Sequence, residues 1–261
     1  MPNNTKDFVL NTLGINPVVY DFVRQTEKEL AGQMQAIDEI AEYNQIKALA
    51  AMQKNKLSDI HFAATTGYGY NDLGRDVLEK IYADVFRTEA ALVRPQIISG
   101  THALTVAIAG NLKYGDGLFS PCGAPYDTLQ GVIGIRETKG SLIENGILYS
   151  QTELDVTGGF DYPAIKKAVT PKTKMAILQR SKGYAWRKSF TVKELGEAIA
   201  FIKACNPNVI CLVDNCYGEF VDYLEPSDVG ADITVGSLIK NPGGGLAPVG
   251  GYIAGKEEYI E

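Results

Sequence analysis

Residues 232–245 read Asp232-Ile233-Thr234-Val235-Gly236-Ser237-Leu238-Ile239-Lys240-Asn241-Pro242-Gly243-Gly244-Gly245. The apolar run over residues 233–235 followed by a glycine-rich stretch predicts a buried strand that ends in a loop. Lys240 follows this strand, at the sheet edge where ligands gather in open α/β folds. Its amine could form a Schiff base if burial or a nearby cation lowers its pKa. A solvated lysine is the commoner case, but Ser237 favours a cofactor site because its hydroxyl could bind a phosphate from the same turn.

Asp214 ends a second apolar run, residues 209–213, so a carboxylate follows another buried strand. Placed against a pyridine nitrogen, this acid would keep the nitrogen protonated and make the ring an electron sink. An acid in this position could instead bind a ribose hydroxyl, bind a metal or cap the next helix. These alternatives stay open on the residues alone.

Ser99-Gly100-Thr101 follows a predicted strand at residues 95–98 and opens a helix. The free N–H groups and the dipole of a helix N-terminus favour a phosphate, and the glycine permits close approach. A simple strand-to-helix turn with a cap is the alternative. Tyr126 lies where the next predicted strand gives way to a helix, and its ring could stack on a flat cofactor or merely pack, as many of the 14 tyrosines must.

The chain beyond residue 60 alternates short apolar runs with helical patterns, which predicts an α/β fold with a mostly parallel central sheet and helices on both faces. Residues 61–261 form the expected large domain. Asn16-Pro17 predicts the start of a helix in residues 1–60, and we expect either one long helix or two with a break near Gly32, an arm that could cover a neighbouring subunit. The expected strands are 95–98, 117–120, 175–179, 209–213, 233–235 and 250–254, and the expected helices begin near Asp72, Thr101, Tyr126, Tyr162 and Thr191.

Composition narrows the class of protein. The 261 residues are 45% hydrophobic and 21% charged, as in an ordinary soluble globular protein. The formal net charge of −6 argues against nucleic acid and favours a small-molecule partner. Because there is no apolar run of about 18 residues and no export pattern, we expect no membrane partner and a cytoplasmic location. Four cysteines without a CxxC pair and two histidines predict no metal site.

Taken in chain order, four motifs resemble those of the fold-type I pyridoxal-phosphate enzymes of Cys/Met metabolism, the cystathionine and methionine γ-lyase group. The motifs are Ser99-Gly100-Thr101, Tyr126, Asp214-Asn215 and Ser237-Leu238-Ile239-Lys240. Residues 65–72, 179–184 and 241–245 are similar to the divergent branch of methionine γ-lyase-like or aluminium-resistance proteins.

The resemblance implies pyridoxal 5'-phosphate as cofactor and Lys240 and Tyr126 as catalytic residues. Lys240 would form the Schiff base and then shuttle the α-proton of an amino acid substrate, while Asp214 would pair with the ring nitrogen and Tyr126 would stack. The implied reaction is that of a carbon–sulfur lyase, by α,β- or α,γ-elimination from a sulfur amino acid. An aminotransferase, an aldolase and a non-catalytic cofactor-binding module remain the alternatives. The implied cofactor-binding set is Ser99, Gly100, Thr101, Tyr126, Asp214, Ser237 and Lys240.

At some positions this chain differs from the motifs of the family. Tyr68 or Arg75 would take the place of the arginine that reaches a neighbouring subunit's phosphate, and Ser181 is a further candidate. Ile239 stands where a hydroxyl-bearing residue is common. The resemblance also implies a homodimer or homotetramer and a smaller C-terminal domain that supplies an arginine for the substrate carboxylate. Because the sequence stops at Glu261 inside an opening helix, we expect that domain to be absent and the chain to be part of a longer protein.

Overall fold

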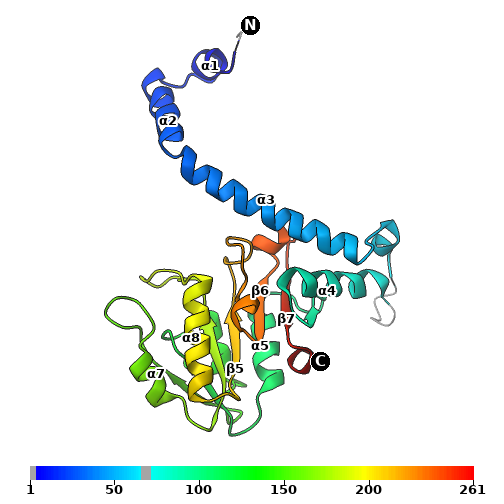
Figure 1. Cartoon of the computed structure of the whole chain (residues 1–261), viewed down its shortest axis with the longest axis vertical. Coiled ribbons are helices and arrows are strands. Elements are labelled where there is room, and N and C mark those ends of the chain that lie inside the picture. Colours follow the sequence, from blue (N-terminus) through cyan, green and yellow to red (C-terminus); the bar gives the residue numbers. More distant parts are fainter. Residues whose placement is uncertain (1–3, 66–71) are drawn as a thin grey trace. The chain divides into compact units, whose positions relative to one another are not determined.

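A seven-stranded sheet with the strand order β1-β7-β6-β5-β4-β2-β3 forms the centre of the computed structural model, which describes residues 4–65 and 72–261 (Figure 1). Neighbouring strands are parallel except β7, which is antiparallel to both β1 and β6. The strands are β1 (Ala90–Leu92), β2 (Gly117–Ser120), β3 (Leu148–Gln151), β4 (Thr173–Gln179), β5 (Ile210–Asp214), β6 (Ile233–Ser237) and β7 (Gly251–Gly255). The predicted fold class, a mostly parallel sheet in an α/β domain, is confirmed.

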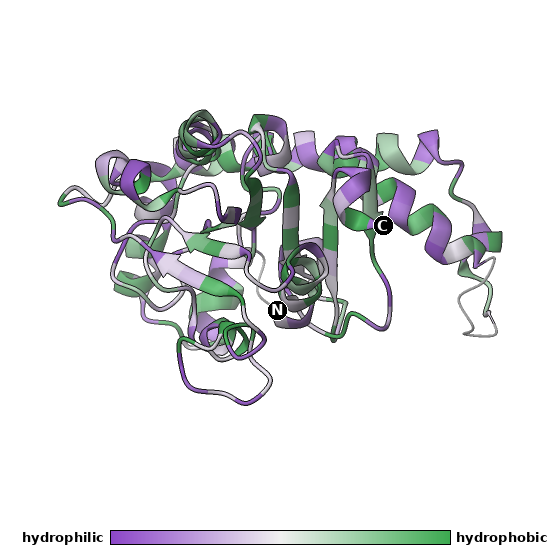
Figure 2. Ribbon diagram, turned by 90° about the horizontal axis from the view of Figure 1, so that it is seen from below, coloured by the Kyte–Doolittle hydropathy of each residue, from purple (hydrophilic) through white to green (hydrophobic). Residues whose placement is uncertain are grey.

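Helices cover both faces of the sheet because its strands are apolar on both sides. In β4, Met175 and Ile177 pack in the cluster that contains α5 and α6, whereas Ala176 and Leu178 pack in the cluster with α7 and α8. The strands are accordingly coloured largely as hydrophobic in Figure 2, while the outer helices are mixed. These helices are α4 (Leu73–Phe86), α5 (Gly100–Asn111), α6 (Asp127–Ile133), α7 (Tyr162–Ala168), α8 (Val192–Cys205) and α9 (Glu257–Ile260).

The order of the strands reverses between β2 and β4. From β2 the chain goes to β3 on one side, whereas β4, β5 and β6 follow on the other side. In such sheets the crevice at the carboxyl edge of the reversal is where ligands bind. The last residues of the strands that meet this edge are Ser120, Gln179, Asp214 and Ser237.

The strand predicted at residues 95–98 is wrong. The structure places β1 earlier, at Ala90–Leu92, and residues 95–98 form a turn in which Ile97 N donates to Arg94 O at 3.0 Å. Pro95 has no backbone N–H to donate to a neighbouring strand, and this explains why the apolar run here does not form a strand. The edge strand β3 was not predicted.

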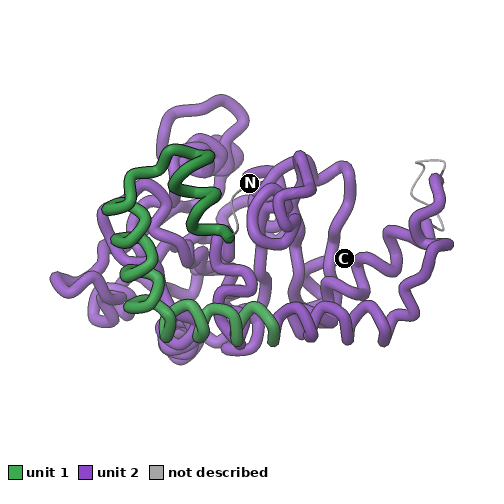
Figure 3. Tube along the Cα trace, turned by 90° about the horizontal axis from the view of Figure 1, so that it is seen from above, with its two compact units in different colours: residues 1–43 green, residues 44–261 purple. Residues whose placement is uncertain are grey.

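The chain divides into two compact units, residues 1–43 and 44–261, coloured separately in Figure 3. The first unit contains α1 (Thr5–Asp7), a turn of π-helix (Phe8–Thr12), α2 (Pro17–Glu29) and the first part of α3 (Ala31–Lys54). The predicted start of α2 is confirmed, because the Asn16 side chain accepts a hydrogen bond from Val18 N at 2.8 Å with Pro17 at the first position. Across the described ranges, no helix has the length and apolarity needed to cross a membrane.

Candidate active site

Lys240 and Asp214 lie on the wall of one cavity of about 340 Å³ at the carboxyl edge of the sheet. The structure therefore brings together two residues that are 26 positions apart, as the strand ends predict. The cavity is lined by Tyr126, Asp127, Thr128, Gln179, Ser181, Gly183, Tyr184, Asp214, Cys216, Tyr217 and Lys240.

Asp214 ends β5 and is buried, with 2% of its surface exposed. Its Oδ1 accepts a hydrogen bond from Cys216 N at 3.1 Å. Burial raises the pKa of Asp214, against the smaller lowering effects of the Cys216 hydrogen bond and the Lys240 charge. A cation beside a buried carboxyl group favours its ionised form. Asp214 is therefore suited to pair with a protonated ring nitrogen.

Lys240 follows β6 in a turn whose backbone is held by Lys240 N donating to Ser237 O at 3.3 Å. Its Nζ lies 4.0 Å from the centroid of the Tyr217 ring. Burial acts to lower the pKa of Lys240, but Cys216, Asp214 and Tyr217 outweigh burial, so the pKa is raised. The shift is thus opposite to the lowering that would favour Schiff-base formation, and the amine is held as an ammonium ion.

The predicted phosphate-binding residues also meet. The start of α5 lies against the end of β6, because a Cβ on Gly100 would come within 2.9 Å of Ser237 Cβ. Ser99 caps α5 by accepting from His102 N at 3.1 Å, and Thr101 Oγ1 lies 3.0 Å from Tyr126 Oη. A glycine at position 100 therefore lets the start of α5, whose N–H groups favour a phosphate, pack closely against the end of β6.

Tyr126 precedes α6, and its backbone N–H donates to Gln179 Oε1 at 2.9 Å. The ring lies half-buried on the wall of the Lys240 cavity. Burial raises the pKa of Tyr126 to about 12, against a lowering effect of its hydrogen bond with Thr101. The hydroxyl therefore keeps its proton at neutral pH and can donate it in a hydrogen bond.

Two further candidates are placed and one is not. Ser181 lines the Lys240 cavity, and its carbonyl accepts from Gln179 Nε2 at 3.1 Å and from Arg187 at 2.6 Å. Arg75 instead forms an ion pair of 2.8 Å with Asp76 and lines another cavity of about 560 Å³. Within one chain, Arg75 is therefore not part of the Lys240 cavity. Tyr68 lies outside the described residues.

Sequence reasoning gave no site role to several residues of the cavity wall, among them Gln179, Cys216 and Tyr217. Gln179 is the last residue of β4, so its position at the carboxyl edge was a usable signal. Cys216 and Tyr217 follow Asp214 in the same turn, which was a signal too. A larger cavity of about 840 Å³ shares Tyr126, Asp127, Gln179 and Tyr184 with the first but does not include Lys240 or Asp214.

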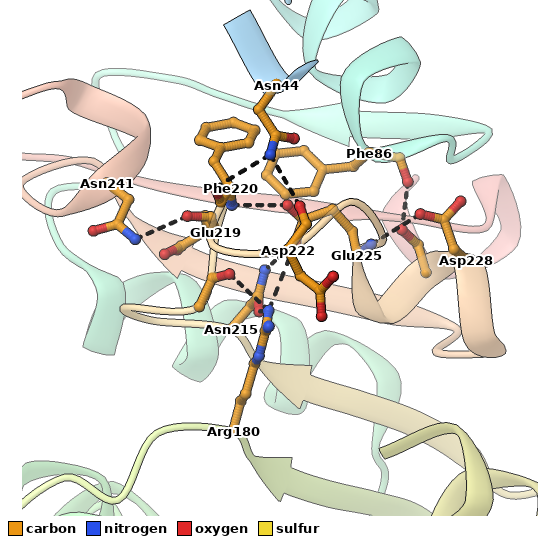
Figure 4. A network of polar contacts seen from close by, with 12 residues as sticks. Asn44, Phe86, Arg180, Asn215, Glu219, Phe220, Asp222, Glu225, Asp228 and Asn241 are labelled. Atoms are coloured by element: carbon orange, nitrogen blue, oxygen red, sulfur yellow. Dashed lines mark hydrogen bonds and ion pairs between the residues drawn. The ribbon is translucent and has the colours of Figure 1, made fainter. Parts of the chain in front are cut away.

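A buried polar network holds the turn after Asp214 (Figure 4). Arg180 donates to Asn215 Oδ1 at 2.9 Å and to Gly218 O at 2.7 Å, and Asn215 donates to Glu225 Oε2 at 2.9 Å. Asn241, the residue after Lys240, donates to Glu219 O at 2.8 Å. The network therefore connects the turn that carries Asp214 to the loop that carries Lys240.

A sheet with a lysine and a buried acid at its carboxyl edge, beside a helix N-terminus with a glycine, is the large domain of fold-type I pyridoxal-phosphate proteins. The pyridoxal-phosphate-dependent protein YhfS from Escherichia coli shares this fold, with a TM-score of 0.63 at 19% sequence identity. The model of the methionine gamma-lyase family matches residues 19–261, and the chain belongs to that family. The resemblance inferred from the motifs is confirmed.

Several longer proteins align with most of this chain. The uncharacterised protein YnbB from Bacillus subtilis is 51% identical over 255 residues, which are 97% of this chain and 61% of YnbB. A carbon-sulfur lyase involved in aluminium resistance from Clostridium novyi has a structure with a TM-score of 0.92 at 44% identity, covering 100% of this chain and 62% of that protein. A Listeria monocytogenes protein linked to aluminium resistance gives 0.91 at 56% identity, over 92% of this chain and 61% of that one. The chain spans about three fifths of the length of these relatives.

Proposed function

We propose that the chain is the cofactor-binding part of a pyridoxal-phosphate-dependent lyase that cleaves a carbon–sulfur bond in an amino acid. The observation that carries this proposal is the presence of Lys240 and Asp214 on the wall of one cavity. Membership of the methionine gamma-lyase family supports the class of reaction, α,β- or α,γ-elimination from a sulfur amino acid.

The residues present fit pyridoxal 5'-phosphate. Lys240 would hold it covalently through Nζ, and Asp214 would face its ring nitrogen. Because Gly100 packs closely against Ser237, the α5 N-terminus and the Ser237 hydroxyl lie side by side and would together hold the phosphate. The bound cofactor supplies the electron sink for the carbanion at the substrate's α-carbon.

The chain's own residues would then move and hold protons. Once free of the cofactor, the Lys240 amine must lose its ammonium proton before its Nζ can take the α-proton of the substrate. Asp214 would hold the proton on the ring nitrogen by its charge. Tyr126 would pack against the ring, and its protonated hydroxyl, already hydrogen-bonded to Thr101, would orient substrate atoms.

We also propose that the protein acts on a free amino acid as a homodimer or homotetramer. Large apolar side chains on the helices of the first unit support association, because Val18 and Phe22 are 75% and 70% exposed in the single chain. The overall acidic charge supports a small substrate rather than nucleic acid.

Turnover distinguishes the alternatives. We expect the intact protein, supplied with pyridoxal 5'-phosphate, to release a thiol, a 2-oxo acid and ammonia together from a sulfur amino acid such as cysteine, cystathionine or methionine. Lys240→Ala should abolish release, and Lys139→Ala, at an exposed lysine, should not. Amino-group transfer without thiol release would replace the lyase by an aminotransferase, and cofactor binding without any turnover would leave a binding module.

A further inference from the structure

The turn after Asp214 has an unusual backbone. Tyr217 has a φ of +68°, a left-handed conformation that a bulky residue rarely adopts. The turn is held in place by Asn215 N donating to Val235 O at 2.8 Å and by Gly218 N donating to Asn215 O at 2.7 Å. A strained residue at a candidate site, held by the bonds around it, indicates that the position of its side chain matters.

The strained turn presents two side chains to one amine. The Tyr217 ring lies 4.0 Å, centroid to Nζ, from Lys240, within the range of a cation–π contact. The thiol of the buried Cys216 also lies beside the Lys240 amine, on the wall of the same cavity. The backbone N–H of Cys216 meanwhile donates to Asp214 Oδ1, so the same residue contacts both members of the proposed cofactor pair.

We propose that Cys216 and Tyr217 form a dock for the ammonium group of Lys240 in the cofactor-free protein, which holds the amine beside Asp214 until the cofactor binds. Both are positioning residues in this proposal, because they act through Lys240. The dock gives the free amine one defined place before it joins the cofactor. This inference deepens the proposed function, and its purpose rests on that function.

Electrostatics supports the dock. The groups that face Lys240 are Cys216, Asp214 and Tyr217; burial lowers the pKa of Lys240, and the charge of Asp214 acts against burial. Burial also raises the pKa of Cys216, so its thiol stays neutral and its sulfur faces the ammonium group as a weak acceptor. An aromatic face, a polarisable sulfur and one carboxylate suit an ammonium ion rather than a neutral amine.

The dock can be tested without turnover by the reactivity of the amine in the cofactor-free protein. Acetic anhydride acylates only neutral amines, so the labelling of Lys240 against pH reports when the ammonium loses its proton. Peptide mass spectrometry would measure this labelling relative to the exposed Lys193 of the same chain. The variants are Tyr217→Leu with Tyr217→Phe as its matched control, and Cys216→Ala with Cys216→Ser as its own.

We expect Tyr217→Leu to move the midpoint of Lys240 labelling to lower pH, with about fivefold faster labelling at a fixed pH below the midpoint, as the loss of a cation–π contact of ordinary strength implies. Cys216→Ala should move it in the same direction. Tyr217→Phe keeps the aromatic face and Cys216→Ser keeps an acceptor, so both should stay close to the parent. A change in mere access to the amine would scale labelling equally at every pH and leave the midpoint in place.

The dock is overturned if the parent midpoint persists in both Tyr217→Leu and Cys216→Ala. A leucine at position 217 could unfold the strained turn. If Tyr217→Leu shows no cooperative thermal unfolding, the comparison of Cys216→Ala with Cys216→Ser decides the test. Failure of the proposed function would give a different result. If the midpoint shifts but Lys240 never binds the cofactor covalently, the dock is supported and the lyase proposal is wrong.

Discussion

At the scale of single residues, Glu219 is the most unusual carboxyl group near the site. Its side chain is fully buried, and Oε1 accepts from the Tyr252 hydroxyl at 3.2 Å. Within the part of the chain that the structure describes, Oε2 has no hydrogen-bond partner. Burial raises the pKa of Glu219 to about 8, and the charges of Glu225 and Asp214 act in the same direction. Glu219 is therefore neutral at pH 7.

A raised carboxyl pKa predicts a stability that falls as the pH rises. Neutral Glu219 contributes fully to the free energy of unfolding below its ordinary pKa of 4.5. This contribution is lost as the pH rises to the folded-state pKa of about 8, because Glu219 ionises at lower pH in the unfolded chain than in the folded one. We expect Glu219→Gln, which cannot ionise, to unfold at a higher temperature than the parent above pH 8. The difference should shrink towards pH 5.

Thermal unfolding from pH 5 to pH 9 checks this expectation. Glu197→Gln, at an exposed position on α8, is the control and should follow the parent at every pH. If the Glu219→Gln and parent curves stay parallel, Glu219 does not carry the pH dependence.

The residues that converge on the site were predictable to the extent that strand ends reveal them. Lys240 and Asp214 follow apolar runs, and parallel strands place their carboxyl ends at one edge. The place of Cys216 and Tyr217 next to Asp214 was visible in the sequence, but their contacts with Lys240 were not, since a positive φ at a tyrosine leaves no mark in hydrophobic periodicity. The ion pair of Arg75 with the adjacent Asp76 was not predicted, and a role of Arg75 at a neighbouring subunit's phosphate stays a prediction.

At the scale of elements, the contact between α5 and β6 shapes the proposed phosphate site. Gly100→Ala would place a Cβ 2.9 Å from Ser237 Cβ, so the helix start must move away from the strand. We expect at least about tenfold weaker cofactor binding, equivalent to about 1.4 kcal/mol, measured by absorbance titration.

Gly110 provides a matched control in the same helix, since a Cβ there would meet nothing within 4 Å. Gly110→Ala should leave cofactor affinity unchanged and stabilise the fold by roughly 0.5–1 kcal/mol, as alanine does for glycine within a helix. Equal cofactor affinity in the two variants would contradict the role given to the α5 N-terminus.

Short elements were the part of the fold that the sequence predicted least well. The three-residue strand β1 consists of two alanines and a leucine, which have little strand preference, and the stronger apolar signal at residues 95–98 contains a proline. The strands β2, β4, β5, β6 and β7 were predicted within about two residues because strands buried on both faces, whether parallel or, like β7, antiparallel, give continuous apolar runs.

At the scale of the whole molecule, the apolar side chains of residues 17–41 raise the question of what they pack against. Their helical spacing indicated a packing face, but within one chain Phe22 is 70% and Ile37 60% exposed. Periodicity identifies an apolar face and not its partner. A second copy of the protein is the partner we propose.

Light scattering on the intact protein tests that proposal. We expect the mass of a dimer or tetramer, and a shift towards smaller species in a Phe22→Ser, Ile37→Ser double variant, because the buried apolar area is lost. The control is Lys28→Ser in the same helix, which should keep the parent mass. A parent that is monomeric at all concentrations would contradict homo-oligomerisation.

The central claim, that Lys240 and Asp214 serve one cofactor, is tested most directly by locating the lysine that the cofactor modifies. The protein would be mixed with pyridoxal 5'-phosphate, reduced with borohydride and mapped by peptide mass spectrometry. We predict that the phosphopyridoxyl group is found on Lys240 and that Asp214→Ala weakens its incorporation at limiting cofactor. Modification spread over exposed lysines, with Lys240 unmodified, would contradict the claim.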